Sequence, residues 1–148
     1  MLSKACEYAI RASIIIASES QQKNRPGLTE IAEKINSPVA FTAKILQKLV
    51  KNKILMSIKG PGGGFEADKN ALGTIRLIDI VLAIDGISPF SGCSLGLNEC
   101  SEHNPCPVHH KYKPIKEKLI EMFDKTTLEE LVNAYKAGKT FLKLPDMS

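Results

Sequence analysis

The sequence lacks the features that mark membrane and secreted proteins. Its apolar runs, such as the one from Ile14 to Ala17, are far too short to span a bilayer. The first residues contain no basic segment followed by an apolar stretch and a small-residue cleavage site, which is the pattern of a secretory signal. We therefore expect a soluble protein of the cytoplasm with no membrane partner.

Signatures of catalysis are also missing. There is no CxxC pair, no Ser/His/Asp set and no carboxylate pair in an evident pocket. The glycine-rich segment Lys59–Phe65 lacks the lysine and hydroxyl residue that close a P-loop, and it lacks the GxGxxG spacing of a dinucleotide-binding turn. We therefore expect no nucleotide binding and no enzyme, and a small redox enzyme that uses the cysteines is the less favoured alternative.

The composition fits one globular domain with a basic first half. The 148 residues are 43% hydrophobic and 24% charged, which is enough apolar material for a core. Residues 1–70 carry 11 Lys/Arg and 6 Asp/Glu, whereas residues 71–148 carry 9 and 10. The segment from Pro38 to Gly64 has five lysines and no acidic residue. This local charge suits phosphate groups, although a solvated lysine-rich face is the alternative that charge alone leaves open.

The apolar periodicity of the first half predicts three helices followed by a β-hairpin. The hairpin separates this arrangement from a plain helical bundle, because three helices and a hairpin form the order of a winged helix-turn-helix domain. The expected elements are a long helix over Leu2–Ser20, a two-turn helix over Leu28–Ile35 with Thr29 as its N-cap, a helix over Pro38–Asn52, and strands over Ile54–Lys59 and Phe65–Ala67.

A basic third helix beside a glycine-tipped hairpin predicts DNA binding. The helix would read the major groove, and the hairpin would follow the adjacent backbone as a wing. The start of the third helix should face the bases, the lysines should contact phosphate, and the glycines should let the backbone approach DNA. The predicted DNA-binding residues are Pro38, Val39, Ala40, Thr42, Ala43, Lys44, Lys48, Lys51, Lys59, Gly60, Gly62 and Gly63.

The second half of the chain contains a long irregular segment between helices. A helix over Thr74–Asp85, capped by Thr74, precedes a loop over Gly86–Pro107 that is rich in Gly, Pro, Ser and Asn. An amphipathic helix then covers His109–Asp124, and Thr127 with Glu130 forms a capping box for a last short helix. We expect a DNA-binding domain over 1–85, a cysteine loop over 86–108, a dimerisation helix and closing helix over 109–137, and a poorly anchored tail over 138–148.

Three of the four cysteines crowd into the long loop. Cys93, Cys100 and Cys106 are separated by six and five residues, and His109 follows Cys106 after two more. This spacing differs from a zinc ribbon and suits thiolates that wrap an iron-sulfur cluster, while a Cys3His zinc site or redox-active free thiols remain alternatives. Cys6 should be a packing residue, and His103 and His110 should be solvated.

The chain resembles the Rrf2 family of winged helix-turn-helix regulators over nearly its whole length. The resemblance is carried by Leu2-Ser3 with Tyr8-Ala9, by Leu46–Asn52, by the segment Lys59–Phe65, by the three-cysteine loop and by Thr127–Val132. It implies a mainly α fold with a β-hairpin wing. It also implies a homodimer formed through the long helix after the cysteine loop, with two recognition helices on a pseudo-palindromic operator in double-stranded DNA.

The resemblance further implies an iron-sulfur cluster held by Cys93, Cys100 and Cys106, with 2Fe-2S favoured over 4Fe-4S. The fourth ligand would be His109, as in IscR-like members, or Glu7 from the first helix of the partner subunit, as in NsrR-like members. The implied function is regulation of transcription in response to redox, iron or nitric oxide status. The alternative is a regulator of the same fold with zinc or free thiols in the loop.

Two departures from the family pattern stand out. The first two cysteines are one residue further apart than is usual, which bears on the cluster type. Lys53 replaces the glycine that usually follows the recognition helix. We therefore expect Asn52 or Lys53 to adopt the backbone conformation that ends this helix.

Overall fold

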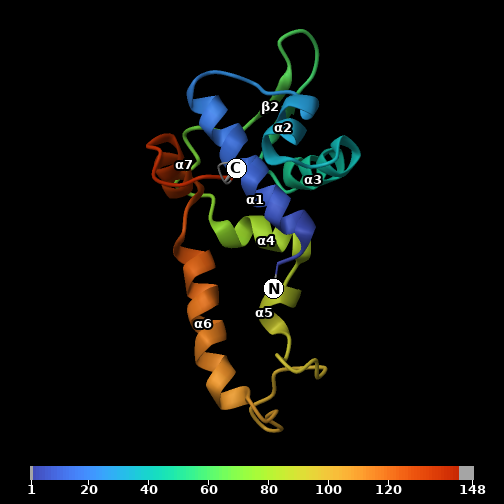
Figure 1. Cartoon of the computed structure of the whole chain (residues 1–148), viewed down its shortest axis with the longest axis vertical. Helices are drawn as coiled ribbons and strands as arrows, with labels where there is room; N and C mark the ends of the chain where they lie inside the picture. Colours follow the sequence, from blue (N-terminus) through green and yellow to red (C-terminus); the bar gives the residue numbers. More distant parts are fainter. Residues whose placement is uncertain (1, 144–148) are drawn as a thin grey trace, which may run out of the picture.

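The computed structural model describes residues 2–143, which form a helical body with a β-hairpin at one end and a long helix extending from the other (Figure 1). The predicted fold class is confirmed. The first half contains α1 (Lys4–Gln21), α2 (Leu28–Ile35), α3 (Val39–Lys51) and an antiparallel pair of strands, β1 (Met56–Ile58) and β2 (Gly64–Glu66). The second half contains α4 (Leu77–Asp85), α5 (Ser88–Ser91), α6 (His109–Lys125) and α7 (Leu128–Lys136).

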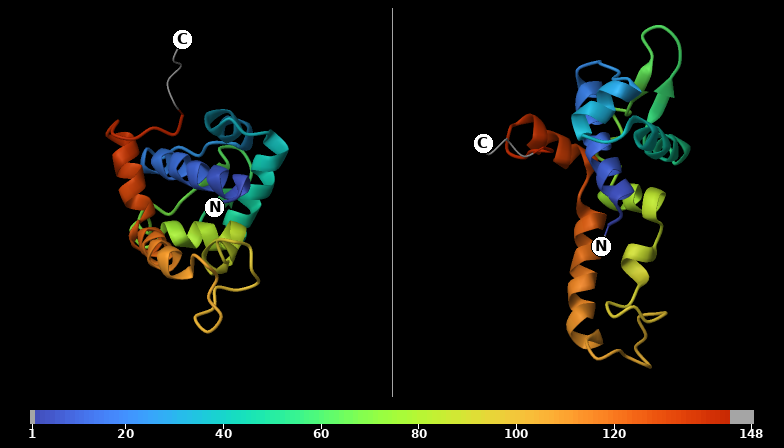
Figure 2. Two further views of the ribbon diagram at one scale, coloured as in Figure 1. Left: turned by 60° about the horizontal axis from the view of Figure 1, so that its bottom comes forward. Right: turned by 45° about the vertical axis from the view of Figure 1, so that its right-hand side comes forward.

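Helix α1 lies at the centre of the body and contacts α2, α3, α4 and α7 (Figure 2). Its N-cap Ser3 accepts a hydrogen bond from the backbone N–H of Cys6 at 3.0 Å. The small side chains of Ala9 and Ala12 are completely buried, so neighbouring helices can approach α1 closely. Larger apolar side chains from five other elements or loops complete the core: Ile31, Leu46, Leu49, Leu55, Ile80 and Leu128.

Two predicted helix caps are wrong. Helix α2 begins after Gly27, so Thr29 lies inside the first turn. Helix α4 begins after Arg76, whose backbone N–H donates to Asp79 Oδ2 at 2.8 Å, whereas Thr74 donates its hydroxyl hydrogen to the Ala71 carbonyl in the preceding turn. Both threonines have suitable cap chemistry, but neither is the N-cap; for α4, the start coincides with a tertiary bridge between Arg76 and Thr127.

Other local predictions have mixed outcomes. Lys53, which follows the C-cap Asn52 of α3, adopts a positive φ of 61°, which confirms one of the two expected helix-ending residues. Thr127 caps α7 by accepting from the Glu130 backbone N–H at 3.2 Å, which confirms the Thr127 half of the predicted capping box. The segment expected to be a loop over 86–107 is wrong in one part, because it includes α5. The ring of Phe90 in α5 packs against Phe123 of α6 with centroids 5.6 Å apart, which explains this short helix.

The described part of the predicted tail, residues 138–143, is better anchored than expected. Leu142 packs against the main hydrophobic core, which contradicts a loose tail at this position. The predicted tail residues 144–148 lie outside the described residues. Among the residues that the structure describes, no helix combines the length and apolar character needed to cross a membrane.

The wing is a short hairpin tied to the α1–α2 connection. β1 and β2 pair in the register Met56–Glu66, Ser57–Phe65 and Ile58–Gly64, which leaves 59–63 as the tip. The tip closes with a hydrogen bond from Gly63 N to Gly60 O at 2.9 Å, and Phe65 N donates to Pro26 O at 2.9 Å. The wing is therefore held against the body at its base while its tip projects into solvent (Figure 1).

We expect Gly64→Ala to destabilise the protein measurably. Gly64 has a φ of +145°, and an added Cβ would lie only 2.5 Å from Arg25 O. Backbone strain of this kind costs on the order of 1–3 kcal/mol, and the clash with backbone adds to it. Urea unfolding should show the loss. Gly27→Ala is the control, because its added Cβ meets nothing within 4 Å; equal stability of the two variants would contradict this account of the wing base.

Candidate DNA interface and metal centre

One face of α3 is turned to solvent and is rich in lysine. At 100° per residue, Ala40, Gln47 and Lys51 lie within about 40° of one another around the helix axis. All three are exposed, as are Lys44 and Lys48, and Val39 at the start of the helix is 45% exposed. The opposite face is the buried stripe of Ile45, Leu46 and Leu49. Ala43 is half-buried, and the other predicted base-facing and phosphate-facing positions are accessible with one exception.

Thr42 is that exception, and its predicted contact with DNA is wrong for this conformation. Its side chain is completely buried, and its hydroxyl donates to the Pro38 carbonyl at 2.9 Å. Thr42 lies about 160° around the helix from Ala40, on the core side. Gln47, which the sequence reasoning missed, occupies the outer face instead. Its spacing of seven residues from Ala40 could have identified it.

The predicted wing residues lie at or next to the hairpin tip. Lys59, Gly60 and Gly62 are exposed, and Gly63 is half-buried. Gly60 and Gly62 have φ values of +89° and +73° with open space at the Cβ position, so glycine is favoured here by the backbone conformation. The tip therefore presents one cation and a stretch of backbone without side chains.

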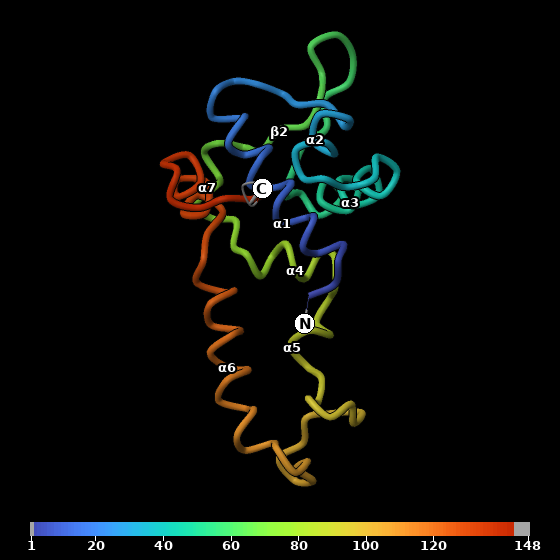
Figure 3. The backbone as a smooth tube through the Cα atoms, in the orientation of Figure 1, coloured from blue at the N-terminus to red at the C-terminus, as the bar shows by residue number. Residues whose placement is uncertain are grey.

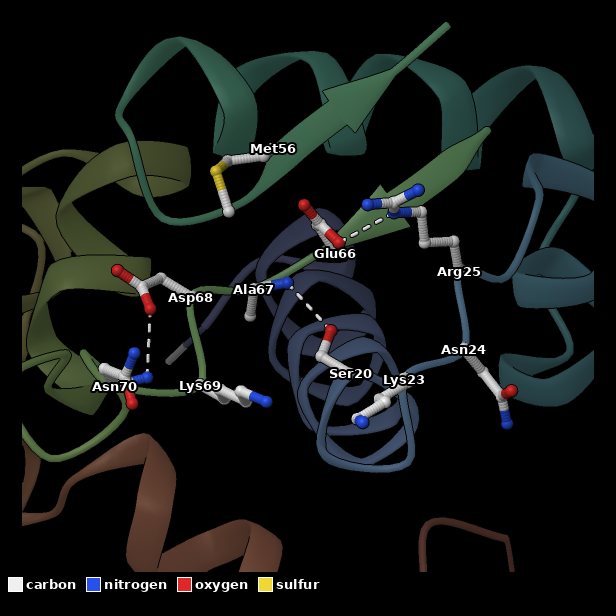
Figure 4. Close-up of a pocket in the computed structure, with 10 residues that line it drawn as sticks. All are labelled: Ser20, Lys23, Asn24, Arg25, Met56, Glu66, Ala67, Asp68, Lys69 and Asn70. Carbon is white, nitrogen blue, oxygen red and sulfur yellow. Dashed lines mark hydrogen bonds and ion pairs between the residues drawn. The ribbon is translucent and has the colours of Figure 1, made fainter. Parts of the chain in front are cut away.

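Arg25 is a second residue that sequence reasoning missed. Its Nε donates to Glu66 Oε2 at 2.8 Å, and its Nη1 lies 3.5 Å from Gly62 O. Figure 4 shows this pair at the base of the wing, beside a surface hollow that Lys23 and Lys69 also line. No local signal in the sequence indicates that a loop residue after α1 reaches the hairpin, because the contact depends on the tertiary fold.

The charges of this face are not neutralised within the chain. Of the residues described, none forms an ion pair with Lys44, Lys48, Lys51 or Lys59. Exposed cations without partners are free to pair with phosphates, and helix and wing present them on neighbouring elements. The geometry is therefore compatible with the predicted helix-in-groove arrangement.

The cysteine loop lies at the end of α6 remote from the wing (Figure 3). Cys93, Cys100 and Cys106 are free and half-buried. Cys100 Sγ lies 3.3 Å from Nδ1 of His109. Backbone N–H groups of Leu95 and Leu97 lower the pKa of the Cys93 thiol, and the Cys106 side chain adds to this effect. The loop thus brings Cys100 close to His109 and surrounds Cys93 with groups that favour its thiolate.

His109 is a buried residue with an incomplete set of partners. It is 2% exposed, and its Nε2 lies 3.2 Å from Glu102 Oε1 without the angle of a hydrogen bond. Glu102 also pairs with Lys113, and these two neighbours, Lys113 first, lower the pKa of the carboxyl to about 2. The ring of His110 is 5.1 Å from that of His109, at 85° to it.

The side chains that come together most closely as possible ligands are Glu102, His109 and His110, whose ligand atoms lie within 4.8 Å of one another. His110 is exposed, as expected, but Glu102 was not among the predicted site residues. Among the described residues the three thiols and the His109 imidazole do not come together as such a group, but they are the donor types that bind iron-sulfur clusters or zinc. The donor chemistry of the loop, including a buried imidazole facing Cys100, therefore fits the implied cluster.

The N-terminal part of α1 contains the two remaining candidates. Cys6 is completely buried, and burial together with Asp85 and Glu7 raises the pKa of its thiol to about 12, which agrees with a packing role. Glu7 is exposed and lies 3.4 Å from Lys4. Within this chain Glu7 is not one of the groups gathered around His109.

Helix α6 carries an apolar face that the chain does not cover. Ile115 is 63% exposed and Met122 is 48% exposed, while Leu119 between them is half-buried. Only Phe123 and His109 of this helix are buried. The helix extends beyond the body beside α5 and the cysteine loop (Figures 1 and 2). A second surface is needed to bury these side chains.

Comparison with known proteins places these features in a family. The Rrf2 family model, described as an iron-dependent transcriptional regulator, matches residues 2–134. The chain is 32% identical over 135 residues to a predicted HTH-type transcriptional regulator of Aquifex aeolicus, which covers 90% of this chain and 92% of that protein. It is 28% identical over 132 residues to the HTH-type transcriptional regulator IscR of Pectobacterium atrosepticum, which covers 89% of this chain and 79% of that protein.

Solved structures share the fold at lower identity. CymR, the global cysteine regulator of B. subtilis, superposes with a TM-score of 0.74 at 22% identity, over 90% of this chain and 96% of that one. IscR of T. potens superposes with a TM-score of 0.70 at 16% identity, over 95% of this chain and 92% of that one.

Proposed function

The chain belongs to the Rrf2 family of transcriptional regulators, and from this premise we propose that it binds a DNA operator as a homodimer whose affinity is set by an iron-sulfur cluster in the cysteine loop. The observation that carries the DNA part is the unpaired lysine face of α3 beside the exposed wing. We further propose that the protein acts in the cytoplasm. Regulation, rather than catalysis, is the function of its relatives.

We assign the roles at the interface by position. The N-terminal residues of α3, namely Pro38, Val39, Ala40 and Ala43, would face the bases, and Gln47 would extend this surface by one turn. Lys44, Lys48, Lys51 and Lys59 would contact phosphates. Glycines at the wing tip would let its backbone approach the sugar-phosphate chain.

In the cysteine loop, Cys93, Cys100 and Cys106 would hold the cluster, and His109 would be the fourth ligand. The 3.3 Å separation of Cys100 Sγ and His109 Nδ1 supports this assignment. Glu7 of the partner subunit is the alternative fourth ligand, and we favour 2Fe-2S over 4Fe-4S. A bound cluster would supply a centre whose oxidation state or loss reports redox, iron or nitric oxide status. Zinc or free thiols in the same loop form the second candidate, since the donor set also suits zinc.

The proposed organisation follows the predicted boundaries. Residues 1–85 would form the DNA-binding unit, 86–108 the cluster loop, 109–137 the dimerisation and closing helices, and 138–148 the tail. The cluster loop and the wing lie at opposite ends of the molecule (Figure 3). A signal from the loop would therefore reach the DNA-binding unit through α5 and α6, where Phe90 and Phe123 pack together with Cys6 of α1.

Selection of bound fragments from a random DNA pool, followed by footprinting, tests the proposed function. A dimer of this fold should enrich a pseudo-palindrome whose half-sites are about one helical turn, or a multiple of it, apart. Binding of the pool without enrichment of any sequence would contradict operator recognition.

We expect Lys59→Ala to weaken binding about equally on all DNA sequences. Each phosphate contact that is lost should lower the magnitude of the slope of log affinity against log salt concentration by roughly one. Titrations at several salt concentrations measure this slope. Lys23→Ala, below the wing, is a useful comparison, and an unchanged slope in Lys59→Ala would remove this residue from the interface.

A further inference from the structure

A second set of ligand atoms lies beside the cysteines at the start of α6. Glu102 Oε1 is 3.2 Å from Nε2 of His109, and His110 contributes a third ligand atom within 4.8 Å of both. Two ligand atoms on a tetrahedral zinc ion, at bond lengths near 2.1 Å, lie about 3.4 Å apart. The Glu102–His109 pair is therefore close to this separation, and the His110 side chain, whose ligand atom lies within 4.8 Å, completes the set.

The buried imidazole gives independent support for a ligand at this place. His109 is 2% exposed, and its Nε2 makes no well-aligned hydrogen bond, although the Glu102 carboxylate lies 3.2 Å from it. Such atoms are rare because an unsatisfied buried polar group is costly. A cation at this nitrogen would satisfy it, and the exposed positions of Glu102 and His110 leave the remaining coordination site open to water.

We propose that Glu102, His109 and His110 form a binding site for a divalent transition cation of the zinc type. Two imidazole nitrogens and one carboxylate oxygen suit zinc, cobalt, nickel or copper, whereas magnesium and calcium prefer oxygen ligands alone. Lys113 now pairs with Glu102 and is 42% exposed, so its ammonium group can move into solvent when the cation takes its place.

The site stands on its own geometry, but one consequence rests on the proposed function. His109 faces Cys100 through Nδ1 and Glu102 through Nε2. A cation at Nε2 would change the charge and the orientation of the imidazole whose Nδ1 faces the cysteine loop. The cation is therefore expected to occupy the cluster-free protein and to hinder cluster assembly.

Cobalt titration of the full-length protein with all three loop cysteines replaced by serine tests this site. The host removes competing thiolates, and circular dichroism checks its fold. We expect cobalt absorption of nitrogen and oxygen ligation, and affinity lowered by about tenfold or more in His110→Ala and in Glu102→Gln. His103→Ala is the matched control, because His103 is exposed in the same loop but outside the ligand group; it should bind as the host does.

Absence of cobalt binding, or equal affinities of His110→Ala and His103→Ala, would overturn the proposed site. If the serine host does not fold, a second host with the three loop cysteines replaced by alanine carries the same two histidine variants through the same cobalt titration. Weakening in His110→Ala alone supports the site, and equal affinities refute it. Neither result depends on operator binding or on iron and sulfide content, so failure of this inference leaves the proposed function separately testable.

Discussion

Reversing the charge of Lys44 and Lys51 together should abolish operator binding under physiological salt. Both side chains are exposed on the outer face of α3, on either side of Gln47. Replacing each with glutamate removes an expected phosphate contact and places a negative charge against the DNA backbone. Each neutralised phosphate contributes to the salt-dependent part of the binding free energy. We therefore expect operator affinity to fall by on the order of 100-fold or more, measured by fluorescence anisotropy on the selected operator.

Lys136→Glu provides the control for this experiment. Lys136 lies on α7, on the other side of α1 from α3, and hydrogen-bonds Gln21 at 2.8 Å (Figure 1). It changes the net charge in the same direction at a site away from the proposed interface, so affinity should fall only slightly. If the α3 double variant kept its affinity while remaining folded, the outer face of α3 would not be the DNA-binding surface.

Ile115→Asp should convert the protein to a monomer and thereby weaken operator binding. Ile115 is 63% exposed and begins the uncovered apolar face of α6 that continues through Leu119 to Met122. If two copies bury this face against each other, a carboxylate at its start would lose most of the apolar contact. We expect dimerisation to weaken by about 30-fold or more, which corresponds to about 2 kcal/mol, the size of effect that a well-buried interface residue has. Analytical ultracentrifugation over a concentration series measures this change.

Phe141→Asp serves as the matched variant for the dimer experiment. Phe141 is also an exposed large apolar residue, at 70% exposure, but it follows α7 and lies outside the α6 face. Its replacement should leave the oligomeric state unchanged. A dimer that survives Ile115→Asp but not Phe141→Asp would move the interface to the chain end, and a native monomer would reject the proposed dimer altogether.

The fold could be predicted because its main elements follow local patterns. The helical spacing of apolar residues in α1 and α3, and the five-residue glycine-rich tip, mark the winged-helix order without tertiary information. Thr42 could have been placed correctly from the helical phase alone. Its helical phase puts it with Leu46 and Leu49 on the buried side, although its polarity resembles that of a DNA-contacting residue.

The features that could not be predicted depend on contacts between distant segments. Thr29 and Thr74 have side chains suited to capping, but both helices start at other residues, and the start of α4 coincides with the tertiary bridge between Arg76 and Thr127. Helix α5 is stabilised by Phe90 against Phe123, which lies over thirty residues away along the chain. Glu102 reaches His109 only because the loop folds back onto α6, so no spacing rule identifies it.

In the cysteine loop, the residue types could be read from the sequence but the kind of inorganic centre could not. Its residue types predicted the donor chemistry, but spacing could not decide between an iron-sulfur cluster, zinc and free thiols. The structure adds the pairing of Cys100 with His109 and the thiolate-stabilising N–H groups around Cys93. These contacts support ligation of an inorganic centre by the loop.

The most direct test is an ultraviolet-visible spectrum of protein purified without oxygen, taken together with its iron and sulfide content. We predict a brown protein that contains both elements and whose visible bands disappear in the Cys100→Ser variant. A colourless native protein that contains zinc or no metal would contradict the iron-sulfur centre, while leaving its assignment as a DNA-binding regulator intact.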